Sequence, residues 1–175
     1  MTAVAEIRPL VAADLRDYKQ LRDEMLLAHP EAFTSDAAEE KSKEPADYLY
    51  RLGLDRRGAG GHFLLGAWRG ERLIGAIGCE RELRAKVRHI GHVVGLMVRR
   101  DLRGRGVGRE LLDACIGEAR RTEGIELLVL TVTSGNEAAV RLYQGCGFIA
   151  YGTLPRAVRI GHIYHDKLHM ALRLR

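Results

Sequence analysis

The residues of this chain that are best suited to chemistry lie in a short loop rich in glycine and arginine. Residues 103–108 read Arg-Gly-Arg-Gly-Val-Gly, between an apolar segment (residues 93–98) and an amphipathic helix expected over residues 106–121. Glycines let the backbone approach an anion closely, and the first N–H groups of a helix have no partner within it. Because the helix dipole is also positive at that end, we expect the loop to bind phosphate.

Two common phosphate-binding motifs do not fit this loop. In a dinucleotide fingerprint the sixth position is glycine, but counting from Gly104 or Gly106 it is Arg109 or Leu111. A Walker loop requires a lysine directly after its last glycine, and no lysine follows here. Hydride transfer and nucleotide hydrolysis are therefore poorly supported.

Length and composition favour a single globular domain over residues 1–175. The three cysteines are odd in number and far apart, which argues against disulfides and a structural metal site. We see no transmembrane-length apolar run and no signal peptide, so we expect a cytoplasmic protein without a membrane partner. The net charge of +5 fits an anionic ligand, but the basic residues are too dispersed to indicate nucleic-acid binding.

Hydrophobic periodicity and turn residues divide the chain into alternating elements. Strands are expected at residues 5–9, 62–68, 72–80, 86–98, 125–132, 148–154 (closed by Pro155) and 164–174. Helices are expected at residues 14–27, 47–54, 106–121 and from 134 to about 145. The second and third strands, joined by Gly70-Glu71, read as a β-hairpin. The pattern predicts an α/β fold, an α+β mixed sheet of about seven mostly antiparallel strands with about four helices.

A second segment at a fixed distance from the loop identifies a family resemblance. Arg103-x-x-Gly106-x-Gly108 resembles the acyl-CoA pyrophosphate loop of the GNAT N-acetyltransferase superfamily. Residues 136–148, Asn-Glu-Ala-Ala-Val-Arg-Leu-Tyr-Gln-Gly-Cys-Gly-Phe, are similar to the N-x-x-A-x-x-L-Y-x-x-x-G-F segment of that family. The resemblance covers at least residues 93–152. It implies a GNAT-like acyl-CoA N-acyltransferase fold, splayed by a bulge near Gly95.

The resemblance also implies a cofactor site, with acetyl-CoA as co-substrate and no metal. The loop would donate N–H groups to the pyrophosphate, and the backbone beside the bulge would bind the pantetheine arm like an added strand. An N–H near Leu96 would polarise the acetyl carbonyl. The expected cofactor-binding residues are Leu96, Met97, Val98, Arg103, Gly104, Arg105, Gly106, Val107, Gly108, Arg109, Asn136 and Tyr143.

Tyr143 is the residue expected to carry chemistry, as the proton donor to the departing sulfur. Its structural alternative is a tyrosine packed on the core, and that of Asn136 is a helix cap. The general base is left open among Glu80, Glu82, His89 and His92, acting directly or through water, with Glu80 and His92 as the expected pair.

We therefore expect an N-acetyltransferase that acts on a primary amine of a small molecule. The amine would attack acetyl-CoA directly in a ternary complex. Alternatives are acetylation of a protein N-terminus or lysine, and a non-catalytic acyl-CoA-binding sensor. The acceptor pocket is expected between residues 14–54 and 154–164, where the acidic stretch 36–44 could attract a cationic amine. Exposed strand edges are compatible with a homodimer.

Overall fold

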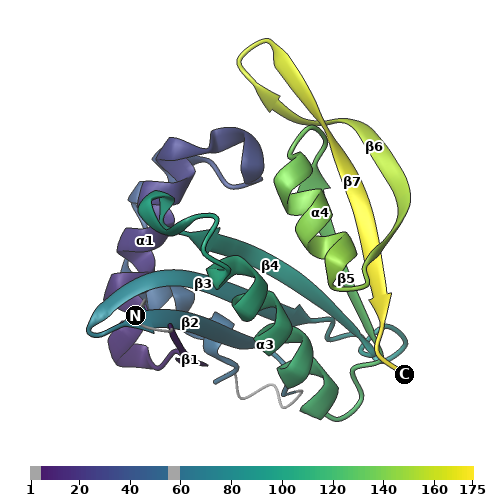
Figure 1. Ribbon diagram of the computed structural model, residues 1–175, viewed down its shortest axis with the longest axis horizontal. Helices are drawn as coiled ribbons and strands as arrows, with labels where there is room; N and C mark the ends of the chain where they lie inside the picture. Colours follow the sequence, from purple (N-terminus) through teal and green to yellow (C-terminus); the bar gives the residue numbers. More distant parts are fainter. Residues whose placement is uncertain (1–4, 55–59) are drawn as a thin grey trace.

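The computed structural model describes residues 5–54 and 60–175, which build a seven-stranded sheet (Figure 1). The strands are β1 (Glu6–Pro9), β2 (Phe63–Arg69), β3 (Arg72–Arg81), β4 (Ile90–Val98), β5 (Leu127–Thr133), β6 (Ile149–Ile160) and β7 (Ile163–Arg173). The helices are α1 (Leu15–Ala28), α2 (Ala37–Lys41), α3 (Val107–Arg121) and α4 (Glu137–Gly145). Short 3-10 helices are η1 (Ala12–Asp14), η2 (Pro30–Ala32), η3 (Pro45–Leu52) and η4 (Arg100–Leu102).

The sheet has the order β1-β2-β3-β4-β5-β7-β6, and its neighbours are antiparallel except for the parallel pair β4–β5. The β2–β3 hairpin is confirmed, with Arg69 opposite Arg72 across the turn. Since the parallel step needs a crossover, α3 connects β4 to β5. The predicted mixed, mostly antiparallel sheet is therefore confirmed.

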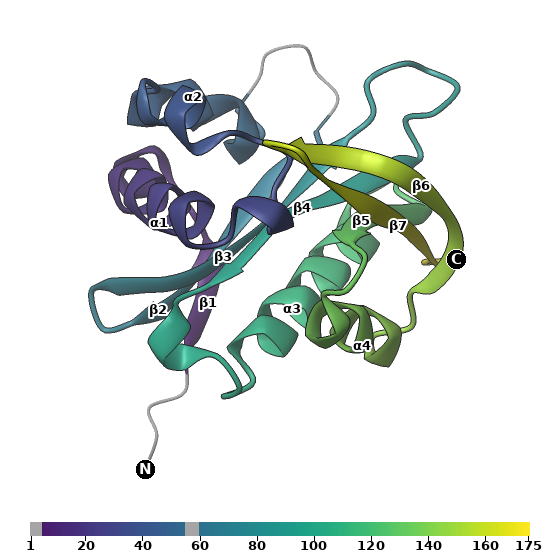
Figure 2. The same ribbon diagram turned by 90° about the horizontal axis from the view of Figure 1, so that it is seen from above.

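Helices cover both faces of the sheet, as the view from above shows (Figure 2). One core lies under α3 and α4 and includes Leu111, Leu112 and Phe148. The other lies under α1 and η3 and includes Tyr18, Leu21, Tyr48 and Met97. On α1 the buried side chains recur every three or four residues, which places them on one face of the helix.

The sheet opens where β4 leaves β5. The two strands pair only from Ile90 opposite Leu127 to His92 opposite Val129. Beyond this, Gly95 has a positive φ of 60°, and the register between β3 and β4 shifts next to it. A residue in this left-handed conformation makes a β-bulge that redirects the strand. The expected bulge near Gly95 and the splay beside it are confirmed.

Three expected element boundaries were wrong. Residues 86–89 are not strand, because Val87 and Ile90 donate backbone hydrogen bonds to carbonyls three residues earlier and form turns. The expected helix over residues 47–54 is a 3-10 helix that begins at Pro45 and ends before Gly53, which has a left-handed φ of 71°.

The strand expected to close at Pro155 instead continues to Ile160. Pro155 lies in a register shift between Leu154 and Val158, on an edge strand, where a missing N–H removes no ladder hydrogen bond. Asp166 accepts a hydrogen bond from the Arg156 N–H (2.8 Å) and holds this bulge. The result is a long β6–β7 hairpin that stands out from the rest of the molecule (Figure 1).

Candidate active site

The glycine-rich loop has the backbone that an anion site needs. Gly104 and Gly106 both have positive φ, 72° and 86°, and a Cβ at either position would meet no atom within 4 Å. Gly106 is the N-cap of α3, and no side chain caps that helix. The first N–H groups of α3 therefore have no side-chain cap, and they lie at the positive end of the helix dipole. This geometry suits a phosphate group.

The arginines around the loop have different surroundings. The Arg103 side chain turns back to the Val98 carbonyl (3.4 Å) and towards the Met25 sulfur, while Arg105 is exposed. Arg109, expected at the cofactor, instead hydrogen-bonds Asp113 one turn further along α3, at 2.9 Å. Arg103 and Arg105 thus remain the arginines best placed for phosphate oxygens.

A cavity of about 590 Å³ follows the open edge of β4 and reaches Arg103, the only residue of this loop that lines it. Leu96, Met97, Val98, Arg103 and Asn136 line it, so the structure brings together five of the expected cofactor-binding residues. Because β5 does not pair with β4 here, the backbone groups along this edge are free to bind an extended ligand.

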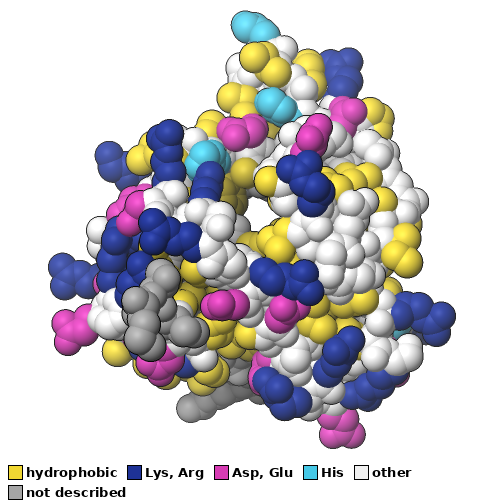
Figure 3. Space-filling model, in the orientation of Figure 1, with side chains coloured by type: hydrophobic (Ala, Val, Ile, Leu, Met, Phe, Trp, Pro, Cys, Tyr) yellow, Lys and Arg dark blue, Asp and Glu magenta, His cyan; other side chains and the backbone are white. Residues whose placement is uncertain are grey.

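A second cavity of about 300 Å³ adjoins the first on the other side of the bulge. Gly95, Leu96, Asn136 and Tyr143 line it, and Leu96 and Asn136 line both cavities. The space-filling view shows the molecule hollowed between its N-terminal half and the β5–β7 half (Figure 3). The two cavities therefore meet at the bulge, where two ligands could approach each other.

Tyr143 lies on α4 at this junction and is 9% exposed. Its ring packs edge-on against Phe148, with centroids 5.9 Å apart, so part of its role is structural. No other described residue hydrogen-bonds its hydroxyl group. Burial raises the pKa of Tyr143 to about 12, which keeps the phenol protonated at neutral pH. The hydroxyl can therefore donate a hydrogen bond into the cavity.

Asn136 combines both roles weighed for it. Its Oδ1 accepts a hydrogen bond from the Ala139 N–H (3.2 Å) and so caps α4, while the residue lines both cavities. The cap fixes the N-terminus of the helix that carries Tyr143.

The two expected bases, Glu80 and His92, lie directly opposite each other on β3 and β4. Glu80 Oε1 lies 3.5 Å from Arg51 Nε, and His92 Nε2 lies 3.1 Å from Glu82 Oε1. Neither lines the cavities, although Val94, two residues beyond His92, does. Either group would therefore reach the junction through water. His89 lies in the turn that precedes β4.

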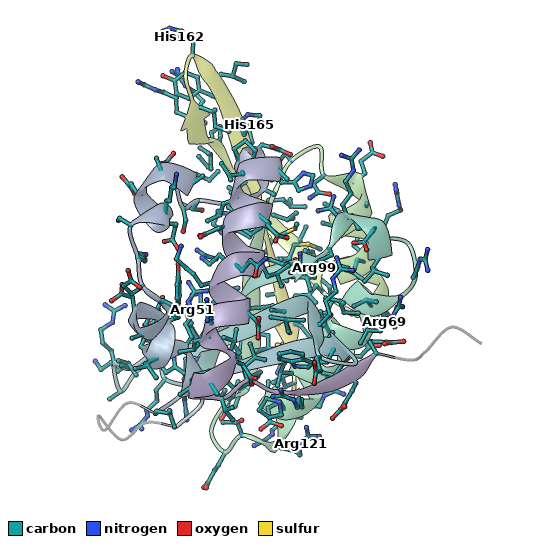
Figure 4. All side chains as sticks on the ribbon, turned by 90° about the vertical axis from the view of Figure 1, so that its left-hand side faces the viewer. Arg51, Arg69, Arg99, Arg121, His162 and His165 are labelled. Carbon is teal, nitrogen blue, oxygen red and sulfur yellow. The ribbon has the colours of Figure 1, made fainter. Side chains whose placement is uncertain are left out.

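The structure adds three cations that the sequence reasoning missed: Arg22, Arg51 and Lys167 line the second cavity. Arg51 lies beside α1, and His162 at the tip of the β6–β7 hairpin, well away from it (Figure 4). One signal was available, because Arg22 lies four residues after Tyr18 on the mostly apolar buried face of α1.

Two acids of the stretch 36–44 are engaged within the protein itself. Asp36 caps α2 by accepting hydrogen bonds from two N–H groups. Glu40 is buried and receives hydrogen bonds from Arg22, Lys43 and Tyr48. Burial alone would raise the pKa of this carboxyl, but the three donors outweigh it and lower the pKa to about 2. Glu40 therefore positions Arg22 and is not free to bind a ligand.

Residues 5–54 and 60–175 contain no group of three or more His, Cys, Asp or Glu side chains that could hold a metal ion. None of their helices is long and apolar enough to cross a membrane.

Comparison with known proteins identifies the family. The sequence model of the acetyltransferase (GNAT) family matches residues 19–148. An L-methionine sulfoximine/L-methionine sulfone acetyltransferase of Pseudomonas paraeruginosa is 41% identical over 59 residues, which is 34% of each chain. N-alpha-acetyltransferase 30 of Schizosaccharomyces pombe is 29% identical over 86 residues, covering 49% of this chain and 57% of the relative. The matches thus span about a third to a little over half of the relatives' lengths.

The fold agrees with solved structures over nearly the whole chain. A protein from Salmonella typhimurium, solved with its cofactor acetyl-CoA, superposes with a TM-score of 0.84 at 23% identity. The match covers 98% of this chain and 94% of the other. At this identity the likeness concerns the fold.

Proposed function

This chain belongs to the acetyltransferase (GNAT) family, and from that premise we propose that it transfers an acetyl group from acetyl-CoA to a primary amine of a small molecule. The amine attacks directly while both substrates are bound. The observation that carries the proposal is the pair of cavities that meet at the Gly95 bulge, one leading to the phosphate loop and one lined by Tyr143. A relative that acetylates L-methionine sulfoximine supports a small acceptor.

The residues present fit acetyl-CoA, which supplies an acetyl thioester when bound. The N–H groups of residues 103–108 bind its diphosphate at the uncapped end of α3. The open edge of β4 at Leu96–Val98 binds the pantetheine arm, with Asn136 on the opposite wall. Holding both substrates at the bulge makes positioning the main contribution to catalysis.

Tyr143 and a base in the β3–β4 region handle the protons. The Tyr143 hydroxyl holds its proton in the resting enzyme and donates it towards the departing sulfur as general acid. Glu80 or His92, acting through a water molecule, takes the proton that the amine must lose. The N–H that follows the bulge, at Leu96, polarises the acetyl carbonyl.

For the setting of the reaction we propose the cytoplasm, a single domain and a homodimer. The three cysteines are free. The edge strand β6 exposes Ile149, Tyr151 and Leu154, which a second copy could cover. Light scattering after size-exclusion chromatography measures the dimer directly, and a monomer at micromolar concentration would refute it.

A thiol-release assay with acetyl-CoA tests the function. Small amines, amino acids, aminoglycosides and peptides serve as acceptors, and acetyl-CoA binding is measured in parallel by calorimetry. We expect turnover with small amines. Turnover with peptides alone would favour acetylation of a protein N-terminus, which the similarity to N-alpha-acetyltransferase 30 keeps as the second candidate. Binding without turnover on any acceptor would identify a sensor.

A further inference from the structure

The cavity assigned to the acceptor is lined by cations from three separate elements. Arg22 comes from α1, Arg51 from η3 and Lys167 from β7. A Cβ built on Gly95 would lie 3.7 Å from Arg51 Nη1 and 3.9 Å from Arg22 Nη1. The two guanidinium groups therefore flank the bulge itself, where the reacting groups must meet.

Both guanidinium groups are held in place by some of their nitrogens and leave others unused. Arg22 donates from Nε to Glu40 and from Nη2 to Ser35 Oγ, each at 2.9 Å. Arg51 donates from Nε to Tyr50 and from Nη1 to Tyr18, also at 2.9 Å. Within the described part of the chain, Arg22 Nη1 and Arg51 Nη2 have no hydrogen-bond acceptor. Such a fixed fork with free N–H groups suits a carboxylate.

Lys167 is the least compensated of the three cations. It is 6% exposed, and no carboxylate of the described residues lies within ion-pair distance of it. Burial lowers the pKa of its ammonium group. An ammonium group in a buried wall is costly unless an anion joins it. Among the described residues the Lys167 ammonium group thus lacks a negatively charged partner, and the residue lines the cavity.

The carboxylates nearby do not balance these charges. Glu40 is shared by Arg22, Lys43 and Tyr48, and Glu80 Oε1 lies 3.5 Å from Arg51 Nε. The cavity wall therefore keeps an excess of positive charge. The phosphate loop lies elsewhere, since Arg103 lines the other cavity and not this one. The excess is thus available to the acceptor.

Resting on the acetyltransferase function proposed above, we propose that the acceptor is an amino acid or a close analogue, whose carboxylate binds to Arg22, Arg51 and Lys167. Because the cations flank the bulge, the bound carboxylate lies close to the point of acetyl transfer. An amine one carbon away from its acid group, as in an α-amino acid, fits this spacing better than an amine with a distant acid.

Matched acceptors test the proposal. Each L-amino acid in a panel is compared with its own carboxamide, which keeps the amine and the side chain and removes the negative charge. We expect kcat/KM to be at least about tenfold higher for the acids, because a buried charge left without its partner is penalised. Equal kcat/KM values for acids and amides would overturn the proposal.

The variant Lys167→Met removes the uncompensated cation and keeps a similar side-chain volume. We expect KM for the amino acid to rise about tenfold or more, with acetyl-CoA affinity unchanged. Lys86→Met, an exposed lysine on the turn before β4, is the matched control and should leave both values as they are. Lys167→Gln repeats the test if the methionine variant folds poorly. A loss of acetyl-CoA affinity without a change in acceptor KM would overturn the assignment.

Direct binding separates this inference from the function on which it rests. The amino acid with the lowest KM, or each member of the panel if none turns over, is added to wild type and Lys167→Met in thermal melts. A rise in melting temperature that needs Lys167 supports the carboxylate site even without turnover, while the acetyltransferase function would then fall. No rise in wild type with any member would overturn the carboxylate site.

Discussion

Replacing Glu40 by glutamine should destabilise the fold by about 3 kcal/mol at neutral pH, and by progressively less in acid. Arg22, Lys43 and Tyr48 all donate to this buried carboxylate. Their hydrogen bonds overcome the opposing effect of burial and lower its pKa from 4.5 to about 2. Each tenfold change in the proton equilibrium is worth about 1.4 kcal/mol, which gives the figure of about 3 kcal/mol.

The pH range of the effect follows from the direction of the pKa change. A carboxyl group whose pKa is lower in the folded protein binds its proton more readily when unfolded. Its stabilisation is therefore complete above the unfolded pKa, near 4.5, and is lost as the pH falls towards 2. Since the protonated acid resembles the glutamine amide, the difference between wild type and variant should shrink by about 2 kcal/mol between pH 7 and pH 3.

Urea denaturation at pH 7 and pH 3, followed by the fluorescence of the buried Trp68, measures both quantities. Glu39→Gln is the matched control, because Glu39 is exposed on the same short helix, and its cost should be within about 0.5 kcal/mol of zero. The reasoning is refuted if Glu40→Gln costs no more than the control at pH 7. It is equally refuted if the cost is the same at both pH values.

Three further outcomes are expected. Tyr143→Phe should lower kcat about a hundredfold and leave acetyl-CoA affinity nearly intact, and an unchanged kcat would remove Tyr143 from the catalytic groups. Gly106→Val should abolish acetyl-CoA binding in calorimetry, whereas Gly70→Val, with a similar positive φ in the β2–β3 turn, should cost stability alone; retained affinity in Gly106→Val would contradict the loop assignment. The native protein should react slowly with a disulfide reagent at pH 8, because burial raises the pKa of all three thiols, of Cys79 to about 12 and of Cys146 to about 11. Any thiol that reacted within the mixing time would be inconsistent with that burial.

The features of the sequence analysis that the structure confirms are those encoded locally. A helix follows the glycine-rich loop as expected, with Gly106 as its N-cap. Gly95 interrupts a good strand sequence, and an interior glycine favours a bulge. Within such motifs, neighbours in sequence are also neighbours in space, so spacing carries the information.

Local sequence motifs could not predict the acceptor cavity, because the residues that line it come from segments far apart in the chain. Arg22, Arg51 and Lys167 meet only after α1, η3 and β7 have packed around the bulge. In the sequence Arg51 and Lys167 look like ordinary surface charges, and only Arg22 is marked by its place among the buried residues of a helix. The prediction that a strand ends at Pro155 was wrong for a related reason. Whether proline ends a strand depends on the partner strand and on the edge position.

The short pairing between β4 and β5 has a consequence for how firmly the free protein holds together. Among the described residues, three registered pairs connect these two strands, although both continue well past them. Beyond these pairs, β4 and β5 do not form the backbone hydrogen bonds that their lengths would allow. A ligand that supplies partners along this seam stabilises the native state by mass action. The melting temperature should therefore rise with the fraction of protein that holds a ligand along this seam, and the unliganded protein should be the less stable form.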